Sequence, residues 1–154
     1  MKKLIIAGIL VILGLGIASF YLNNQYSKTA ESLPGVSAGA SIGESVDKIK
    51  LISSGEPVDL KQYLVKDHVV IFDFYADWCG PCRILGPKIE ELINKNEKLL
   101  LRKINIVNWN SEVAKQYQIQ FVPNVRVYDT QGQLVGEPTP EYNKIVQYME
   151  QAQK

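Results

Sequence analysis

The two cysteines of the chain are the residues whose type and spacing best support covalent chemistry. Cys79 and Cys82 stand in the segment Trp78-Cys79-Gly80-Pro81-Cys82, after an apolar run and before a stretch with helical periodicity. At a helix N-terminus, free backbone N–H groups and the helix dipole favour negative charge, so a thiol there ionises more readily. We therefore predict that Cys79 is a nucleophile. Cys82, one helical turn further on, would resolve the mixed disulfide that Cys79 forms with a partner.

Two other interpretations of the cysteine pair fit the sequence less well. A zinc site normally needs four ligands, and the only histidine of the chain is His68. A structural disulfide seldom closes a strand-to-helix junction with Gly80 and Pro81 inside it, whereas Pro81 suits a first helical turn. The sequence thus favours a redox-active pair without metal or cofactor, because the two sulfurs carry both electrons. His68 is expected to be exposed and without a role.

The flanking sequence predicts an alternation of strands and helices that would position this pair. The run from 69 to 75 is β-branched and aromatic with almost no polar alternation, which is typical of a central strand covered on both faces. From Cys79 or Gly80 to about Asn96, apolar residues recur at helical spacing and indicate a helix that packs on the sheet and is kinked by Pro87. Further strands are expected over 49–52, 99–106, 125–129 and 134–136, and further helices over 58–64, over 111–117 with Ser111 as N-cap, and from Pro140 onward.

This order of elements predicts an α/β fold with a mixed sheet. The initial alternation implies parallel strands with helices on both faces, and a closing hairpin at Gln131-Gly132 adds antiparallel strands at one edge. The length of 154 residues, with 46% hydrophobic and 21% charged residues, fits one ordinary globular domain. Seventeen basic and sixteen acidic residues leave a net charge of +1, which argues against a nucleic-acid partner.

The N-terminal segment predicts export from the cytoplasm. Lys2 and Lys3 precede an uncharged apolar run over 4–22, which as a helix would span about 28 Å, close to the hydrocarbon core of a bilayer. This hydrophobic helix is either an uncleaved membrane anchor or a cleaved signal peptide, since Gly16 and Ala18 resemble a cleavage site. The lysines in front of the run place whatever follows it in the periplasm or at the cell exterior.

The chain is therefore expected to have three parts. Residues 1–22 form the signal anchor or signal peptide. Residues 23–44, rich in Ser, Gly and Asn without an apolar period, form a flexible linker. Residues 45–154 form the domain that carries the chemistry.

The segment Asp73-Phe74-Tyr75-Ala76-Asp77-Trp78-Cys79-Gly80-Pro81-Cys82 resembles the active-site segment of the thioredoxin family. The resemblance extends further, because Pro87 falls where the family kinks its active-site helix. Val122-Pro123 falls where the family places a cis-proline facing the cysteines. The resemblance covers roughly residues 45–152 and implies a thioredoxin-like fold, with a mixed central β-sheet flanked by helices, and a thiol–disulfide oxidoreductase.

The same resemblance assigns roles to two charged residues. Asp73 looks like the family's buried acid, whose pKa is raised by desolvation and which exchanges a proton with the resolving Cys82 through water. Lys103 falls where thioredoxins place a lysine near that acid, and a cation there would moderate the upward shift.

Other residues would form the surface on which substrates dock. By the resemblance, Trp78 would shield the dithiol from solvent, and Pro123 would present the backbone of Val122 to an extended substrate. The chain departs from the family at Phe121, where many members have a small residue, and at Asn124, where Thr is usual. Both positions line the expected docking surface, so the substrate range is the property that these departures change.

The favoured function is reduction of disulfides in protein substrates outside the cytoplasm. Such a reductase must be recharged, which implies a transmembrane electron donor. Two alternatives stay open: a disulfide oxidase or isomerase that uses the same site, and a partner-binding module whose cysteines only sense redox state. Trp109, in the polar loop Asn108-Trp109-Asn110, would either pack on the domain or contact a partner.

Overall fold

A computed structural model describes residues 47–154 of the chain. The hydrophobic helix predicted within 1–22 and the linker predicted over 23–44 lie outside the described residues. Within 47–154, no helix is both long enough and apolar enough to cross a membrane.

The structure contains every strand and helix predicted within the described residues. In chain order they are β1 (Ile49–Ser54), the 3-10 helix η1 (Leu60–Tyr63), β2 (Val69–Tyr75), α2 (Gly80–Lys95), β3 (Leu99–Asn105), α3 (Glu112–Gln116), β4 (Asn124–Tyr128), β5 (Leu134–Thr139) and α4 (Tyr142–Ala152).

The bounds of several elements differ from the sequence prediction. The helix expected over 58–64 is only the short η1, whose first turn is capped by the Asp59 carboxylate, which accepts from the Lys61 N–H. Strand β5 continues to Thr139, because it is an edge strand and tolerates the missing N–H of Pro138. The last helix consequently begins at Tyr142 and not at Pro140.

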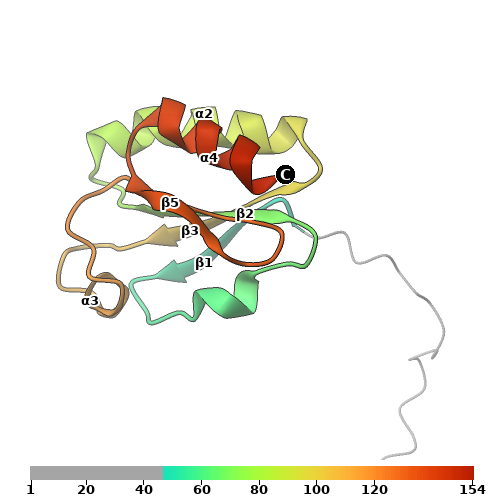
Figure 1. Cartoon of the computed structure of the whole chain (residues 1–154). Coiled ribbons are helices and arrows are strands. Elements are labelled where there is room, and N and C mark those ends of the chain that lie inside the picture. Colours follow the sequence, from blue (N-terminus) through green and yellow to red (C-terminus); the bar gives the residue numbers. More distant parts are fainter. Residues whose placement is uncertain (1–46) are drawn as a thin grey trace, which may run out of the picture. The chain divides into compact units, whose positions relative to one another are not determined.

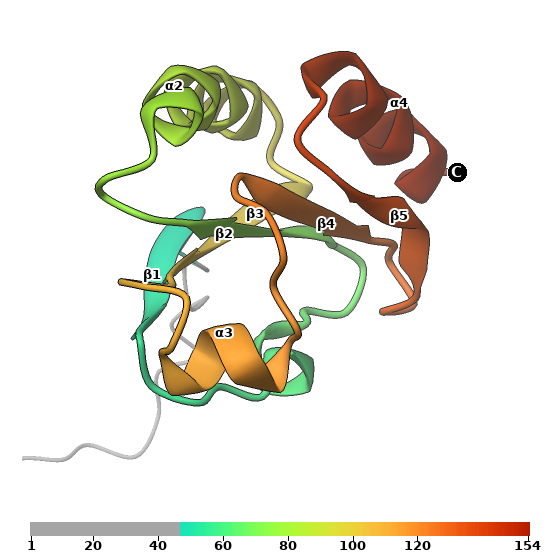
Figure 2. The same ribbon diagram turned by 90° about the vertical axis from the view of Figure 1, so that its left-hand side faces the viewer.

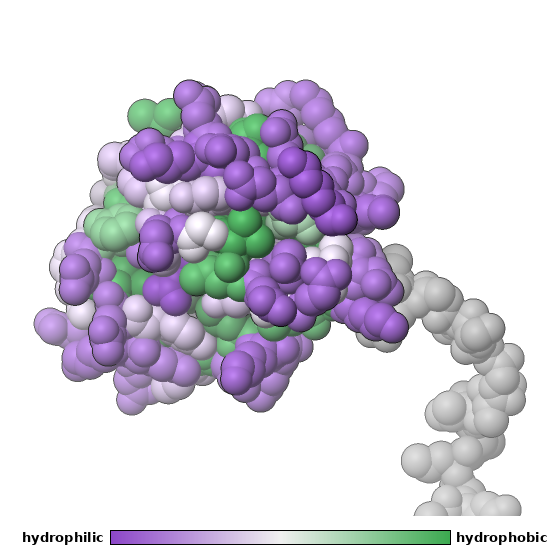
Figure 3. All heavy atoms as spheres, in the orientation of Figure 1, coloured by the Kyte–Doolittle hydropathy of each residue, from purple (hydrophilic) through white to green (hydrophobic). Residues whose placement is uncertain are grey.

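The five strands form one mixed sheet in the order β1-β3-β2-β4-β5. Strands β1, β3 and β2 run parallel, whereas β4 is antiparallel to β2 and β5 is antiparallel to β4, as the sequence predicted. Figures 1 and 2 show α2 and α4 on one face of the sheet and α3 with η1 on the other. Hydrophilic side chains cover most of the face drawn in Figure 3, with apolar patches between them.

Strand β2 lies at the centre of this sandwich and is buried on both faces. Val69 and Ile71 pack into the core beneath α2 and α4, while Phe72 and Phe74 pack into the core that contains residues of α3 and η1. Burial on both sides explains why the sequence of β2 shows almost no polar alternation.

The topology brings three loops to one edge of the sheet. Strands β2 and β3 are parallel and in register, so the residues that follow Tyr75 and Asn105 emerge together. Strand β4 is antiparallel and its first residue, Asn124, pairs with Phe74, so the loop before β4 arrives at the same edge. The cysteine segment, the Trp109 loop and Pro123 thus meet at one end of the domain.

Candidate active site

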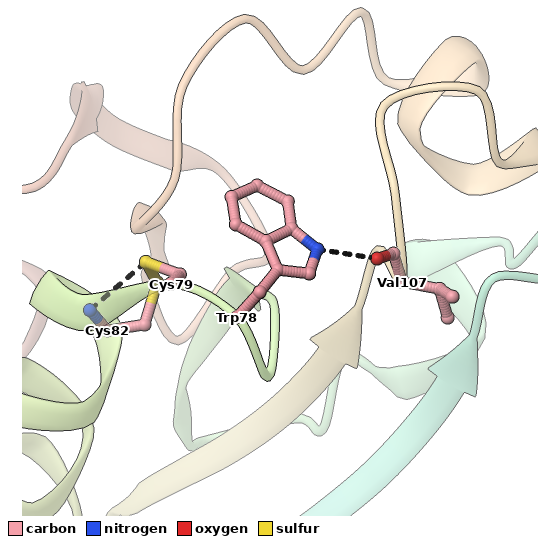
Figure 4. The surroundings of a disulfide bond; sticks show 4 residues. All are labelled: Trp78, Cys79, Cys82 and Val107. Carbon is pink, nitrogen blue, oxygen red and sulfur yellow. Dashed lines mark hydrogen bonds between the residues drawn. A yellow bond between two sulfur atoms is a disulfide. The ribbon is translucent and has the colours of Figure 1, made fainter.

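The cysteine pair lies at the N-terminus of α2, as predicted. Cys79 is the N-cap residue with an extended backbone, and its sulfur accepts a hydrogen bond from the Cys82 N–H at 3.1 Å. Pro81 occupies the first turn, where no N–H is needed. The two sulfurs are joined in a disulfide, drawn in Figure 4. Both cysteines are buried, and the Gly80-Pro81 turn between them is exposed.

Asp73 is a buried acid on the central strand, beneath the cysteine helix. It is only 3% exposed, and its Oδ1 has no hydrogen-bond partner among the described residues. Burial raises the pKa of Asp73 to about 6, while the charge of Lys103 acts to lower it and that of Glu90 to raise it. The carboxyl is therefore mostly ionised above pH 6 and can accept a proton there.

One pocket is lined by both this acid and Cys82. The pocket has a volume of about 290 Å³, and its walls include Asp73, Cys82, Glu90 and Lys103. That volume accommodates several water molecules, each of which occupies about 30 Å³ in the liquid. The pocket thus has room for the water through which the predicted proton exchange between Asp73 and Cys82 would run.

Lys103 lies beside Asp73 but makes its ion pair with another residue. The two residues face each other across β2 and β3, yet the Lys103 ammonium lies 2.7 Å from the carboxylate of Glu90 on α2. It also lies over the ring of Tyr75, 5.0 Å from the ring centre. The cation therefore lowers the pKa of Asp73 through its field and does not neutralise it in a direct pair.

Trp78 is held by a hydrogen-bond chain that begins at the end of β3. Its indole N–H donates to the Val107 carbonyl at 2.6 Å, pointing away from the disulfide in Figure 4. The Val107 N–H donates to the Asn105 side-chain oxygen at 2.8 Å, and the Asn105 amide nitrogen donates to Asp77 at 2.9 Å. The ring of Trp109 packs on that of Trp78, with centres 5.4 Å apart. Trp109 therefore packs on the domain and is also half exposed.

The segment before β4 contains the predicted cis-proline. The Val122–Pro123 peptide bond is cis, and Val122 packs against the apolar cluster that includes both cysteines. Phe121 is exposed, as expected for a docking residue, but Asn124 is buried. The expectation for Asn124 is wrong because its side-chain oxygen accepts from the Arg126 guanidinium at 3.1 Å inside the domain.

Sequence reasoning missed two contributors to this site. Glu90 follows Cys82 and Gly86 at four-residue spacing, which places all three on one helical face and indicates that Glu90 faces the pocket. Val107 has a left-handed backbone with φ of 60°, which no sequence signal indicated because β-branched residues rarely adopt it. Within residues 47–154, no cluster of three or more His, Cys, Asp or Glu side chains is placed to hold a metal ion.

A family model described as Thioredoxin matches residues 54–151 of the chain. The chain belongs to the thioredoxin family. It is 36% identical over 87 residues to thioredoxin of Buchnera aphidicola, an alignment that covers 55% of this chain and 78% of that protein. It is 34% identical over 73 residues to Thioredoxin-T of Drosophila melanogaster, which covers 47% of this chain and 46% of that protein. For several curated relatives, the match thus spans only about half of their length.

Solved structures agree with the fold. Chlamydomonas reinhardtii thioredoxin f2 superposes with a TM-score of 0.54 at 27% identity, covering 68% of this chain and 97% of that one. Spinach chloroplast thioredoxin F, long form, gives a TM-score of 0.57 at 23% identity, covering 77% of this chain and all of that one. Residues 47–154 therefore have the thioredoxin fold.

Removing the buried charge should stabilise the protein in a pH-dependent way. Well below the unfolded pKa of 3.8, Asp73 is protonated in both the folded and the unfolded protein, and its ionisation contributes nothing to stability. Between about pH 4 and pH 6 the folded protein keeps a proton that the unfolded chain releases, so wild-type stability falls as the pH rises. Above pH 6 the loss of folding stability caused by the buried carboxylate is complete and amounts to about 3 kcal/mol. We therefore expect the free energy of unfolding of Asp73→Asn at pH 8 to exceed that of the wild type by about this amount.

Urea unfolding of the oxidised protein at pH 4 and pH 8 measures this difference. Asp67→Asn is the matched control, because it removes an exposed carboxylate. If Asp73→Asn is more stable than the wild type by the same free energy of unfolding at both pH values, the assignment of a raised pKa to Asp73 is contradicted.

Proposed function

We propose that the protein is a thiol–disulfide oxidoreductase that reduces disulfides in protein substrates. The observation that carries this proposal is the cysteine pair at the N-terminus of α2 above a pocket that also reaches Asp73. Membership of the thioredoxin family supports it. The structure contains the oxidised form, with the Cys79–Cys82 disulfide closed.

The proposed reaction moves two electrons in two exchange steps. In the reduced protein, the Cys79 thiolate attacks one sulfur of a substrate disulfide, which breaks that bond and releases a substrate thiolate that takes up a proton. Cys82 then gives its proton, through water in the pocket, to the ionised Asp73 and attacks the Cys79 sulfur. The mixed disulfide breaks, the substrate leaves with both sulfurs reduced, and the protein holds the Cys79–Cys82 disulfide.

The equilibrium reduction potential of this pair tests the direction of electron flow. For the full chain in detergent, titrated against a thiol buffer with alkylation and mass readout, we expect about −270 mV or lower, as in thioredoxin reductants. We also expect the reduced protein to cleave the insulin disulfides and Cys79→Ser to lose at least about 100-fold of that rate, since the attacking sulfur is gone.

Three results would contradict the proposed reductase. A potential of about −120 to −180 mV would make the protein a disulfide donor or isomerase. Full activity of Cys79→Ser would remove Cys79 from the role of nucleophile. A domain that binds partners but turns over no disulfide would instead be a redox-sensing binding module.

We further propose that the domain works outside the cytoplasm, attached to the membrane by 4–22 or released by cleavage there. Lys2 and Lys3 followed by 19 uncharged residues support this proposal. A reductase in that compartment needs two electrons per cycle from a dithiol donor that spans the membrane. The solved complex of thioredoxin f2 with ferredoxin:thioredoxin reductase illustrates a thioredoxin bound to a dedicated reductase.

A membrane-impermeant maleimide tests the location. In intact cells, or in spheroplasts of a bacterium with an outer membrane, we expect Cys79 and Cys82 to react after mild reduction, while thiols of a cytoplasmic control protein do not. Carbonate extraction then separates an anchored chain, which stays in the pellet, from a cleaved one. Labelling that appears only after lysis would contradict the extracytoplasmic location.

A further inference from the structure

We propose that Trp78, Val107 and Trp109, here called the tryptophan surface, bind an aromatic or large aliphatic side chain next to the cysteine of a disulfide-bonded protein substrate. This inference rests on the proposed reductase function and adds a substrate preference to it. Trp109 would be the residue that sets this preference.

The tryptophan surface consists of three exposed apolar residues from two neighbouring loops. Trp78 is 51% exposed, Val107 43% and Trp109 46%. The two indole rings contact each other at an interplanar angle of 57°, and Trp78 is bonded to the backbone of Val107. Large exposed rings that pack on each other from two loops offer a preformed apolar site, and burying them against a partner is favourable.

The loop that carries Trp109 is held in an unfavourable conformation. The left-handed backbone at Val107 is disfavoured for a β-branched residue, and it directs the Val107 carbonyl to Trp78. The side chain of Asn105 accepts the Val107 N–H and thereby stabilises this arrangement. The fold thus maintains a costly conformation at the place where it keeps two tryptophans exposed.

The position of the surface identifies its occupant. Trp78 directly precedes Cys79, so the tryptophan surface adjoins the residue that the substrate sulfur must reach. The loop side chains next to Trp109 are the neutral amides Asn108 and Asn110, and the carbonyl oxygen of the Asn108 amide accepts the Asn110 N–H at 2.8 Å. The exposed surface of Trp78, Val107 and Trp109 is aromatic and aliphatic, which fits an apolar side chain beside the substrate cysteine.

Steady-state kinetics of the full-length protein test the role of Trp109. The substrates are two disulfide-bonded peptides that differ only in Phe or Ser beside the cysteine, together with oxidised glutathione. For Trp109→Ala we expect kcat/KM on the Phe peptide to fall about 5- to 20-fold, mainly through KM, because uniform binding is lost. On the Ser peptide and on glutathione we expect less than a twofold change. Trp109→Phe, which keeps a ring, should retain most of the preference.

Leu134→Ala is the matched control. Leu134 is 44% exposed but pairs with Tyr128 at the opposite edge of the sheet, away from the cysteines. We expect this variant to reduce all three substrates at the wild-type rate.

Three results would overturn the tryptophan surface as a substrate site. An equal loss on all three substrates would show that Trp109 only supports the structure around Cys79. An unchanged preference in Trp109→Ala would show that the ring does not contact the substrate. Dimerisation of the wild type that Trp109→Ala abolishes, without a change in preference, would show that a second copy covers the surface. If the wild type reduces none of the three disulfides, the proposed reductase function itself fails.

Discussion

The burial of β2 on both faces is the constraint on which the site depends. Because the strand is covered by helices above and below, its direction and register are fixed by apolar packing of Val69, Ile71, Phe72 and Phe74. That packing places Asp73 inside the domain and delivers the chain to Cys79 at its end. The unfavourable burial of a carboxyl is thus a consequence of the same packing that positions the cysteines.

Strand β3 links the two halves of the site. In register with β2, it contributes Lys103 beside Asp73 and Asn105 beside Tyr75. Lys103 pairs with Glu90 at the pocket that Asp73 and Cys82 line, whereas Asn105 organises the loop that holds Trp78. One parallel strand pair therefore sets both the electrostatics beneath the disulfide and the shape of the surface next to it.

Much of this arrangement could be predicted from the sequence, because the relevant signals are local. The apolar run of β2, the spacing of Cys79 and Cys82, and a charge inside a buried strand each have one dominant physical interpretation. The cis peptide at Pro123 followed from a family resemblance and not from the residues alone.

The features that escaped prediction depend on tertiary contacts. Asn124 is polar and was expected at the surface, but Arg126 binds it inside the domain. The left-handed conformation of Val107 is accompanied by hydrogen bonds from Trp78 and to Asn105 at its backbone. Strand β5 extends past Pro138 because no strand lies beyond it to require that N–H. Asn105 and Arg126 lie only two residues from their partners, but the contacts of Val107 with Trp78 and of Arg126 with Phe74 join segments that are distant in sequence and leave no local pattern.

The role of Cys79 as nucleophile is tested most directly by trapping its mixed disulfide with a protein substrate. In Cys82→Ser, the first exchange proceeds but nothing resolves it, so we expect a stable covalent complex through Cys79 that a reductant releases. In Cys79→Ser, no such complex should form. Accumulation through Cys82 in Cys79→Ser, with none in Cys82→Ser, would reverse the two roles and contradict the assignment of Cys79 as the nucleophile at the helix N-terminus.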